Sequence, residues 1–100
     1  MKSRTQSQVL IVSRRTIKDK VSLRGSLRHA ARVRVKSVKQ ALRKGRDEHV
    51  AGIVVDMDFR EKGMDGLELA LLLGDLQRRI PIWVAAPRGL LKRLSHQKGD

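Results

Sequence analysis

Two aspartates and two arginines follow predicted strands, and their side chains are the ones best placed for chemistry. Asp56 and Asp58 directly follow one apolar run, while Ser13, Arg14 and Arg15 close another. In an open parallel sheet, the carboxyl ends of the strands meet at one edge, and ligands bind there. Two carboxylates so close together need a neighbouring cation to neutralise them. We therefore expect Arg14 or Arg15 to form an ion pair with one of the two aspartates.

Other signatures of catalysis are not found in the sequence. His29, His49 and His96 are scattered along the chain and share no acidic or cysteine partners. No nucleophile–base pair, glycine-rich phosphate loop or zinc-ligand spacing is recognisable. The chain has no cysteine, which excludes disulfides and thiolate metal sites. The sequence therefore indicates a protein that is not an enzyme and that uses no cofactor or metal.

Alternating strands and helices are predicted to position these residues. The strands are expected at 9–13, 33–36, 52–55 and 80–86, and the helices at 16–29, 39–46, 66–76 and 90–96, with a polar loop at 59–65. This alternation predicts an α/β fold, with an open parallel sheet of about four strands and helices on both faces. Charges on the second strand suit a sheet edge. Residues 1–7 are expected to form a flexible tail, and residues 8–100 a single domain.

The composition allows one modest hydrophobic core. Forty per cent of the residues are hydrophobic, and around the third helix we expect the core to include Met64, Leu67, Leu69 and Leu72. No apolar run approaches the length of a membrane span, and the amino terminus lacks the core of a signal peptide. We therefore expect a soluble, cytoplasmic protein without membrane contact.

The charge is strongly positive. Lys and Arg number 23 against 10 Asp and Glu, a formal net charge of +13, and an acidic segment at 51–77 separates two basic ones. Such a charge is either a solvated coat or a surface for nucleic acid or an acidic protein. The residues expected to bind a polyanion are Arg32, Arg34, Lys36, Lys39 and Arg43. Because only Phe59 and Trp83 are aromatic, binding of single strands by base stacking is not expected.

One part of the sequence resembles the receiver domain of bacterial response regulators. The resemblance is carried by Val54-Val55-Asp56-Met57-Asp58 followed by Gly63-Met64-Asp65-Gly66-Leu67-Glu68-Leu69, and it covers roughly residues 8–90. It implies a receiver-like sheet with the strand order 2-1-3-4. Counting back from Met64, it also places Asp58 at the phosphoacceptor position.

The departures from the receiver pattern fall on the residues of phosphotransfer. Receivers close the first strand with two acids that help to hold Mg²⁺, whereas this chain has Ser13 and Arg14, beside Asp56 in the same pocket. Hard cations need several oxygen ligands. Receivers also carry Thr or Ser where this chain has Ala86, and the chain ends at Asp100 before a fifth strand with its lysine is visible. The resemblance thus implies a degenerate pseudo-receiver.

Three functions remain open from the sequence. The first is a non-catalytic regulatory module that docks to a protein partner or to itself. Without a fifth strand, the side of the fourth would be uncovered, and the possible interface is then Ile80, Ile82, Trp83 and Val84. The second is a basic nucleic-acid-associated protein on a receiver-like scaffold. The third is a working phosphoacceptor at Asp58.

Overall fold

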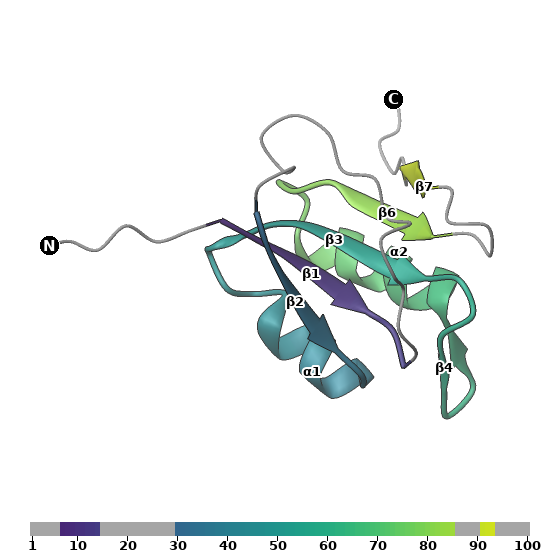
Figure 1. The fold of residues 1–100 in the computed structure, drawn as a ribbon. Helices are drawn as coiled ribbons and strands as arrows, with labels where there is room; N and C mark the ends of the chain where they lie inside the picture. Colours follow the sequence, from purple (N-terminus) through teal and green to yellow (C-terminus); the bar gives the residue numbers. More distant parts are fainter. Residues whose placement is uncertain (1–6, 15–29, 86–90, 94–100) are drawn as a thin grey trace, which may run out of the picture.

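A parallel sheet forms the centre of the structure, a computed structural model that describes residues 7–14, 30–85 and 91–93 (Figure 1). Its four parallel strands are β1 (Gln8–Val12), β2 (Ala31–Val35), β3 (Val50–Asp56) and β6 (Ile82–Ala85). They lie in the order β2-β1-β3-β6. The predicted α/β class and the order 2-1-3-4 are confirmed, with β6 as the fourth strand. This topology is consistent with a flavodoxin-like fold.

The position of each strand follows from its sequence pattern. The strands β1 and β3 are continuous apolar runs, and they lie in the middle of the sheet with nearly every residue buried. Strand β2 alternates: Arg32 and Arg34 are exposed, Val33 is half-buried and Val35 is buried. The predicted edge position of this strand is confirmed.

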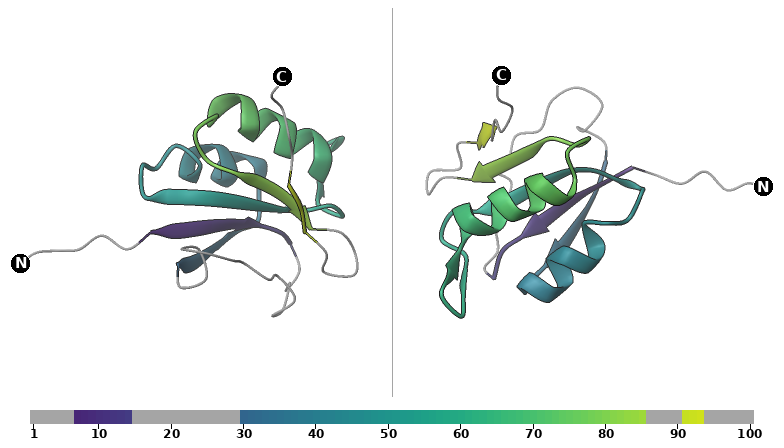
Figure 2. Two further views of the ribbon diagram at one scale, coloured as in Figure 1. Left: turned by 90° about the horizontal axis from the view of Figure 1, so that it is seen from above. Right: turned by 180° about the vertical axis from the view of Figure 1, so that it is seen from behind.

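The two described helices lie on one face of the sheet (Figure 2). They are α1 (Val38–Lys44) and α2 (Gly66–Leu76), and both contribute to the larger hydrophobic core, through Ala41 from α1 and Leu69 and Leu73 from α2. The opposite face has a smaller core. The helix expected at 16–29 lies outside the described residues. None of the described helices is long and apolar enough to cross a membrane.

One of the four expected core residues is exposed. Leu69 is fully buried, and Met64 and Leu72 are half-buried against the core, but Leu67 is 46% exposed. Leu67 precedes Leu69 by two residues, which is a rotation of about 200° around a helix. The buried side of α2 follows Leu69 and Leu73, so Leu67 faces away from the sheet.

The segment after β6 is a strand and not the expected helical turn. Leu91–Arg93 forms β7, which pairs antiparallel with β6. This corrects the prediction of an uncovered fourth strand, because β7 satisfies the backbone groups at that edge. Ile82 and Val84 are buried in the larger core, while Trp83 is half-buried on the opposite face.

The polar loop expected at 59–65 contains a small hairpin. Its strands are β4 (Arg60–Glu61) and β5 (Met64–Asp65), which pair antiparallel. The two turn residues, Lys62 and Gly63, both have positive φ angles, 47° and 86°. Positive φ at both positions is the property of a type I′ turn, which matches the twist of the strands it joins.

Side-chain caps begin both helices. In α2, Asp65 Oδ1 accepts the backbone N–H of Glu68 at 2.9 Å, and Glu68 Oε1 accepts that of Asp65 at 3.1 Å. This reciprocal pair is a capping box. In α1, Ser37 Oγ accepts the N–H of Gln40 at 3.1 Å. The caps satisfy backbone donors that a helix leaves without partners in its first turn.

Gly66 brings α2 against the end of β3. A Cβ atom at this position would overlap the backbone carbonyl oxygen of Asp56. We expect Gly66→Ala to lower the free energy of unfolding by about 1–3 kcal/mol or more, because the obstacle is backbone and cannot rotate away. Denaturant unfolding measures the change.

The matched control is Gly63→Asn. Nothing lies within 4 Å of a Cβ at Gly63, and asparagine tolerates the left-handed conformation. This variant should stay within about 0.5 kcal/mol of the wild type. Equal unfolding midpoints for the two variants would contradict the close approach at Gly66.

Candidate functional site

A buried aspartate closes β3 and organises the carboxyl end of the sheet. Asp56 is 3% exposed and lies beside Ala85 of β6. Ser13 Oγ donates to Asp56 Oδ2 at 3.0 Å, and the backbone N–H of Asp58 donates to Asp56 Oδ1 at 3.0 Å. Both carboxylate oxygens of Asp56 therefore accept hydrogen bonds from the chain itself. We call Ser13, Asp56 and Asp58 the strand-end cluster.

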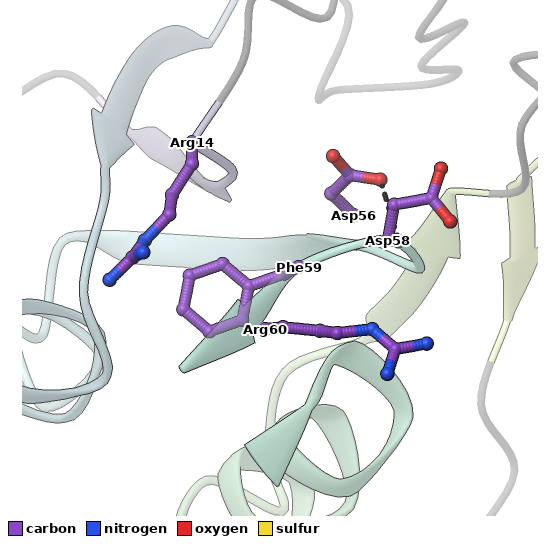
Figure 3. A pocket seen from close by; sticks show the side chains of 5 residues that line it. All are labelled: Arg14, Asp56, Asp58, Phe59 and Arg60. Atoms are coloured by element: carbon purple, nitrogen blue, oxygen red, sulfur yellow. Dashed lines mark hydrogen bonds between the residues drawn. The ribbon is translucent and has the colours of Figure 1, made fainter. Parts of the chain in front are cut away.

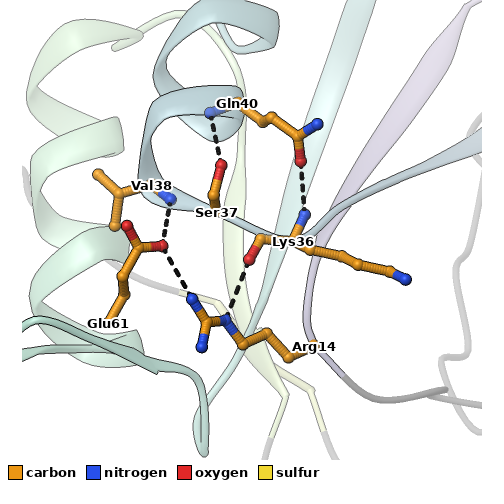
Figure 4. A network of polar contacts seen from close by, with 6 residues as sticks. All are labelled: Arg14, Lys36, Ser37, Val38, Gln40 and Glu61. Carbon is orange, nitrogen blue, oxygen red and sulfur yellow. Dashed lines mark hydrogen bonds and ion pairs between the residues drawn. The ribbon is translucent and has the colours of Figure 1, made fainter.

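Arg14 forms its ion pair with the hairpin and not with the aspartates. Its Nη2 lies 3.4 Å from Glu61 Oε1, and its Nε donates to the carbonyl oxygen of Lys36 at 3.2 Å (Figure 4). The guanidinium carbon is also 5.8 Å from the centre of the Phe59 ring. Arg14 is therefore not the residue that forms the ion pair expected of Arg14 or Arg15 with Asp56 or Asp58, and Arg15 lies outside the described residues.

The β4–β5 hairpin explains the choice of partner. It carries Glu61 to the start of α1, where the same Oε1 atom accepts the backbone N–H of Val38 at 3.0 Å. Figure 4 shows the carboxylate of Glu61 between Val38 and the guanidinium of Arg14. The carboxylate of Glu61 thus links the hairpin to the first turn of α1 and to Arg14.

An open pocket of about 260 Å³ lies at this end of the sheet (Figure 3). It is lined by Arg14, Asp56, Asp58, Phe59 and Arg60. Figure 3 shows the guanidinium of Arg14 directed away from the two carboxylates. The volume lies just below the usual range for small-molecule sites, about 300–1,000 Å³. The pocket is therefore small, polar and mixed in charge.

The strand-end cluster differs from a receiver's magnesium site, because Ser13 and Arg14 stand where receivers have two acids. Mg²⁺ in proteins is octahedral and is usually held by one or two carboxylates together with several waters. Here Ser13 hydrogen-bonds to Asp56, and Arg14 places a cation in the wall of the same pocket. Within the described part of the chain, no three His, Cys, Asp or Glu side chains are grouped to hold a metal ion.

Strand position and motif spacing assign different aspartates to the place of the phosphoacceptor. Asp56 is the last residue of β3, whereas Asp58, selected by counting back from Met64, lies two residues beyond the strand and is exposed. Ala86, at the expected switch position, lies outside the described residues.

The basic residues expected to bind a polyanion are all exposed but lie on two faces. Val33 and Val35 of β2 pack into the core on the α1 side. Because side chains alternate along a strand, Arg32 and Arg34 lie on the opposite face. Lys39 and Arg43 are on α1, so the set surrounds the β2 edge.

His49 has acidic partners that its sequence spacing did not indicate. Its Nδ1 lies 3.0 Å from Asp47 Oδ1, and its backbone N–H donates to the same oxygen at 2.8 Å. That backbone hydrogen bond is the main reason that the pKa of Asp47 is lowered from its ordinary value. The turn precedes β3, at the end of the strand far from Asp56, and His29 and His96 lie outside the described residues.

Sequence reasoning missed Glu61, which is the main partner of Arg14. Gly63 was a partial signal for a turn, since glycine readily adopts positive φ, but Lys62 is not a usual residue at the first position of a type I′ turn. The Ser37–Gln40 and Asp65–Glu68 spacings were also readable as caps. The contact of Glu61 with Arg14 can be predicted only from the folded structure, because 47 residues separate the two in sequence.

Comparisons with known proteins assign no family to the chain. No family model matches it, and neither a curated protein nor a solved structure does. The resemblance to receivers therefore depends on the motif residues and on the topology of the sheet.

The ion pair predicts which substitutions are coupled. A double-mutant cycle of Arg14→Ala with Glu61→Ala should give a coupling energy of up to about 1 kcal/mol, as for other exposed pairs. Arg14→Ala with Asp58→Ala should be additive within about 0.5 kcal/mol. Urea unfolding of the variants measures both cycles, and coupling of Arg14 to Asp58 alone would reverse the assignment.

Proposed function

We propose that the protein is a cytoplasmic, non-catalytic pseudo-receiver, a regulatory protein-interaction module that Mg²⁺-dependent aspartyl phosphorylation does not switch. The observation that supports this most is that the carboxylate of Asp56 is buried and hydrogen-bonded. Its two oxygens accept hydrogen bonds from Ser13 and from the backbone of Asp58, and it is nearly inaccessible to solvent. A carboxylate held in this way is a structural element of the strand end.

Either candidate for the acceptor position leads to the same conclusion. If the acceptor position is Asp56, the attacking oxygen is buried and engaged. If it is Asp58, the carboxylate is exposed, yet the neighbouring positions hold Ser13 and Arg14 in place of the two acids that receivers use. In both cases Ser13 and Arg14 replace two acids that would help to hold Mg²⁺, and Arg14 adds a positive charge to the wall of the pocket.

Treatment with acetyl phosphate and Mg²⁺ tests the proposal directly. Intact-mass spectrometry of the wild type should show no added phosphoryl group. The double variant Asp56→Asn/Asp58→Asn gives the background of modification elsewhere. A phosphoryl adduct that appears in the wild type and disappears in this variant would make the protein a working receiver. Calorimetric titration with Mg²⁺ should likewise give no binding in the micromolar range.

The docking surface can no longer be a free backbone edge of β6, because β7 pairs with it. Of the four residues of the proposed interface, Ile80 and Trp83 are half-buried: Ile80 packs against the larger core, and Trp83 lies beside Val9, Ile11 and Val54 on the face away from α1 and α2. Large aromatic side chains in such partly exposed positions are frequent anchors of protein interfaces.

Self-association through this face should bury Trp83. Since Trp83 is the only tryptophan, its emission should shift to the blue as protein concentration rises. Trp83→Phe should shift the sedimentation equilibrium toward monomer. A wild type that stays monomeric at high concentration would exclude self-docking and leave a different protein as the partner.

A further inference from the structure

The charges of the protein are segregated. Residues 30–46 contain seven basic residues and no acid. All seven are exposed, and we call them the basic edge: Arg32, Arg34, Lys36, Lys39, Arg43, Lys44 and Arg46. The exposed face of α2, in contrast, carries the acids Glu68 and Asp75. A solubility coat mixes the two signs, whereas a field of one sign is typical of a surface that attracts an oppositely charged ligand.

The residues of the basic edge lie on both faces of the sheet next to β2. Arg32 and Arg34 project from the face away from α1, because Val33 and Val35 between them face the core. Lys39 and Arg43 lie four residues apart on α1, one helical turn that places them on one side. Lys36 lies between the two groups, just after β2 ends.

Most of these cations have no internal role. Within the described ranges, Arg34, Lys36, Lys39 and Arg43 form no ion pair, since the described pairs involve Arg14 and His49. Charged side chains that are already solvated and unpaired can contact phosphates without first breaking internal salt bridges. The basic edge can thus bind a polyanion without the loss of internal ion pairs.

We propose that the basic edge binds the phosphate backbone of a nucleic-acid duplex. Single strands are bound chiefly by stacking on aromatic side chains, and here Phe59 is 2% exposed while Trp83 lies on β6, three strands from β2. Duplexes need no such platform, because neutralising phosphates releases condensed counterions. This inference goes beyond the pseudo-receiver proposal and does not depend on it.

Salt dependence of duplex binding tests the proposal with matched variants. Fluorescence anisotropy is measured with labelled DNA and RNA duplexes of one sequence and with the corresponding single strands. For the wild type, log K should fall with log salt by about 0.9 for each phosphate contacted on duplex DNA. Arg34→Gln/Arg43→Gln removes one cation from each face and should make this slope shallower by about 1.8.

The control removes the same charge elsewhere. Arg78→Gln/Arg79→Gln changes two exposed arginines that follow α2, and its slope should equal that of the wild type. Arg34→Lys/Arg43→Lys keeps both charges and should keep the slope, which separates lost contacts from damaged folding. A preference between the DNA and RNA duplexes would identify which of them is the natural ligand.

Three results would overturn the proposal. Equal slopes for the Arg34/Arg43 and Arg78/Arg79 variants would make the effect one of net charge alone. Tighter binding of single strands than of duplexes would contradict the phosphate-only mode. Binding to poly-glutamate but to neither duplex would assign the basic edge to an acidic protein.

Discussion

The burial of one carboxylate organises the end of the sheet at which the residues of the candidate pocket lie. A buried charge costs several kcal/mol unless hydrogen bonds replace its water. At Asp56, Ser13 supplies one hydrogen bond from the position directly after β1, and Asp58 supplies another from the turn after β3. The backbone carbonyl of Asp56 accepts the N–H of Phe59 at 3.0 Å, and it is also the atom against which Gly66 packs. One residue thus joins β1, β3, the following turn and the start of α2.

Sequence patterns predicted those parts of the fold that depend on long, regular segments. Two continuous apolar runs indicated the central strands, the alternation at Arg32 and Arg34 indicated the edge, and the bounds of α2 were correct. The misses are short elements. A strand of three residues such as Leu91–Arg93 has no measurable periodicity, and it exists because β6 presents an edge that it can pair with. The ion pair of Arg14 was also unpredictable, because it requires the position of a hairpin.

That hairpin also explains why motif spacing and strand position disagree about the acceptor. Counting back from Met64 assumes a loop of fixed length between strand and helix. In this chain the loop includes a two-residue turn, Lys62–Gly63, and the difference between Asp58 and Asp56 is two residues. The register of the sheet places Asp56 beside Ala85 and next to the end of β1, whereas Asp58 lies in the turn beyond β3. A count along the sequence and a position in the sheet can therefore select different residues when the connecting loop contains a hairpin.

The order of the strands decides whether the two proposed interactions can coexist. The basic edge lies at β2, and the half-buried Trp83 lies on β6, with β1 and β3 between them. Neighbouring strands are about 4.8 Å apart, so the backbones of β2 and β6 are separated by about 14 Å. A duplex along the β2 edge would contact Arg34 on one face and Arg43 on the other, leaving the far side of the sheet accessible. A protein docked at Trp83 and a polyanion at the basic edge would then contact different strands, β6 and β2, although Arg34 and Trp83 share the face of the sheet away from α1.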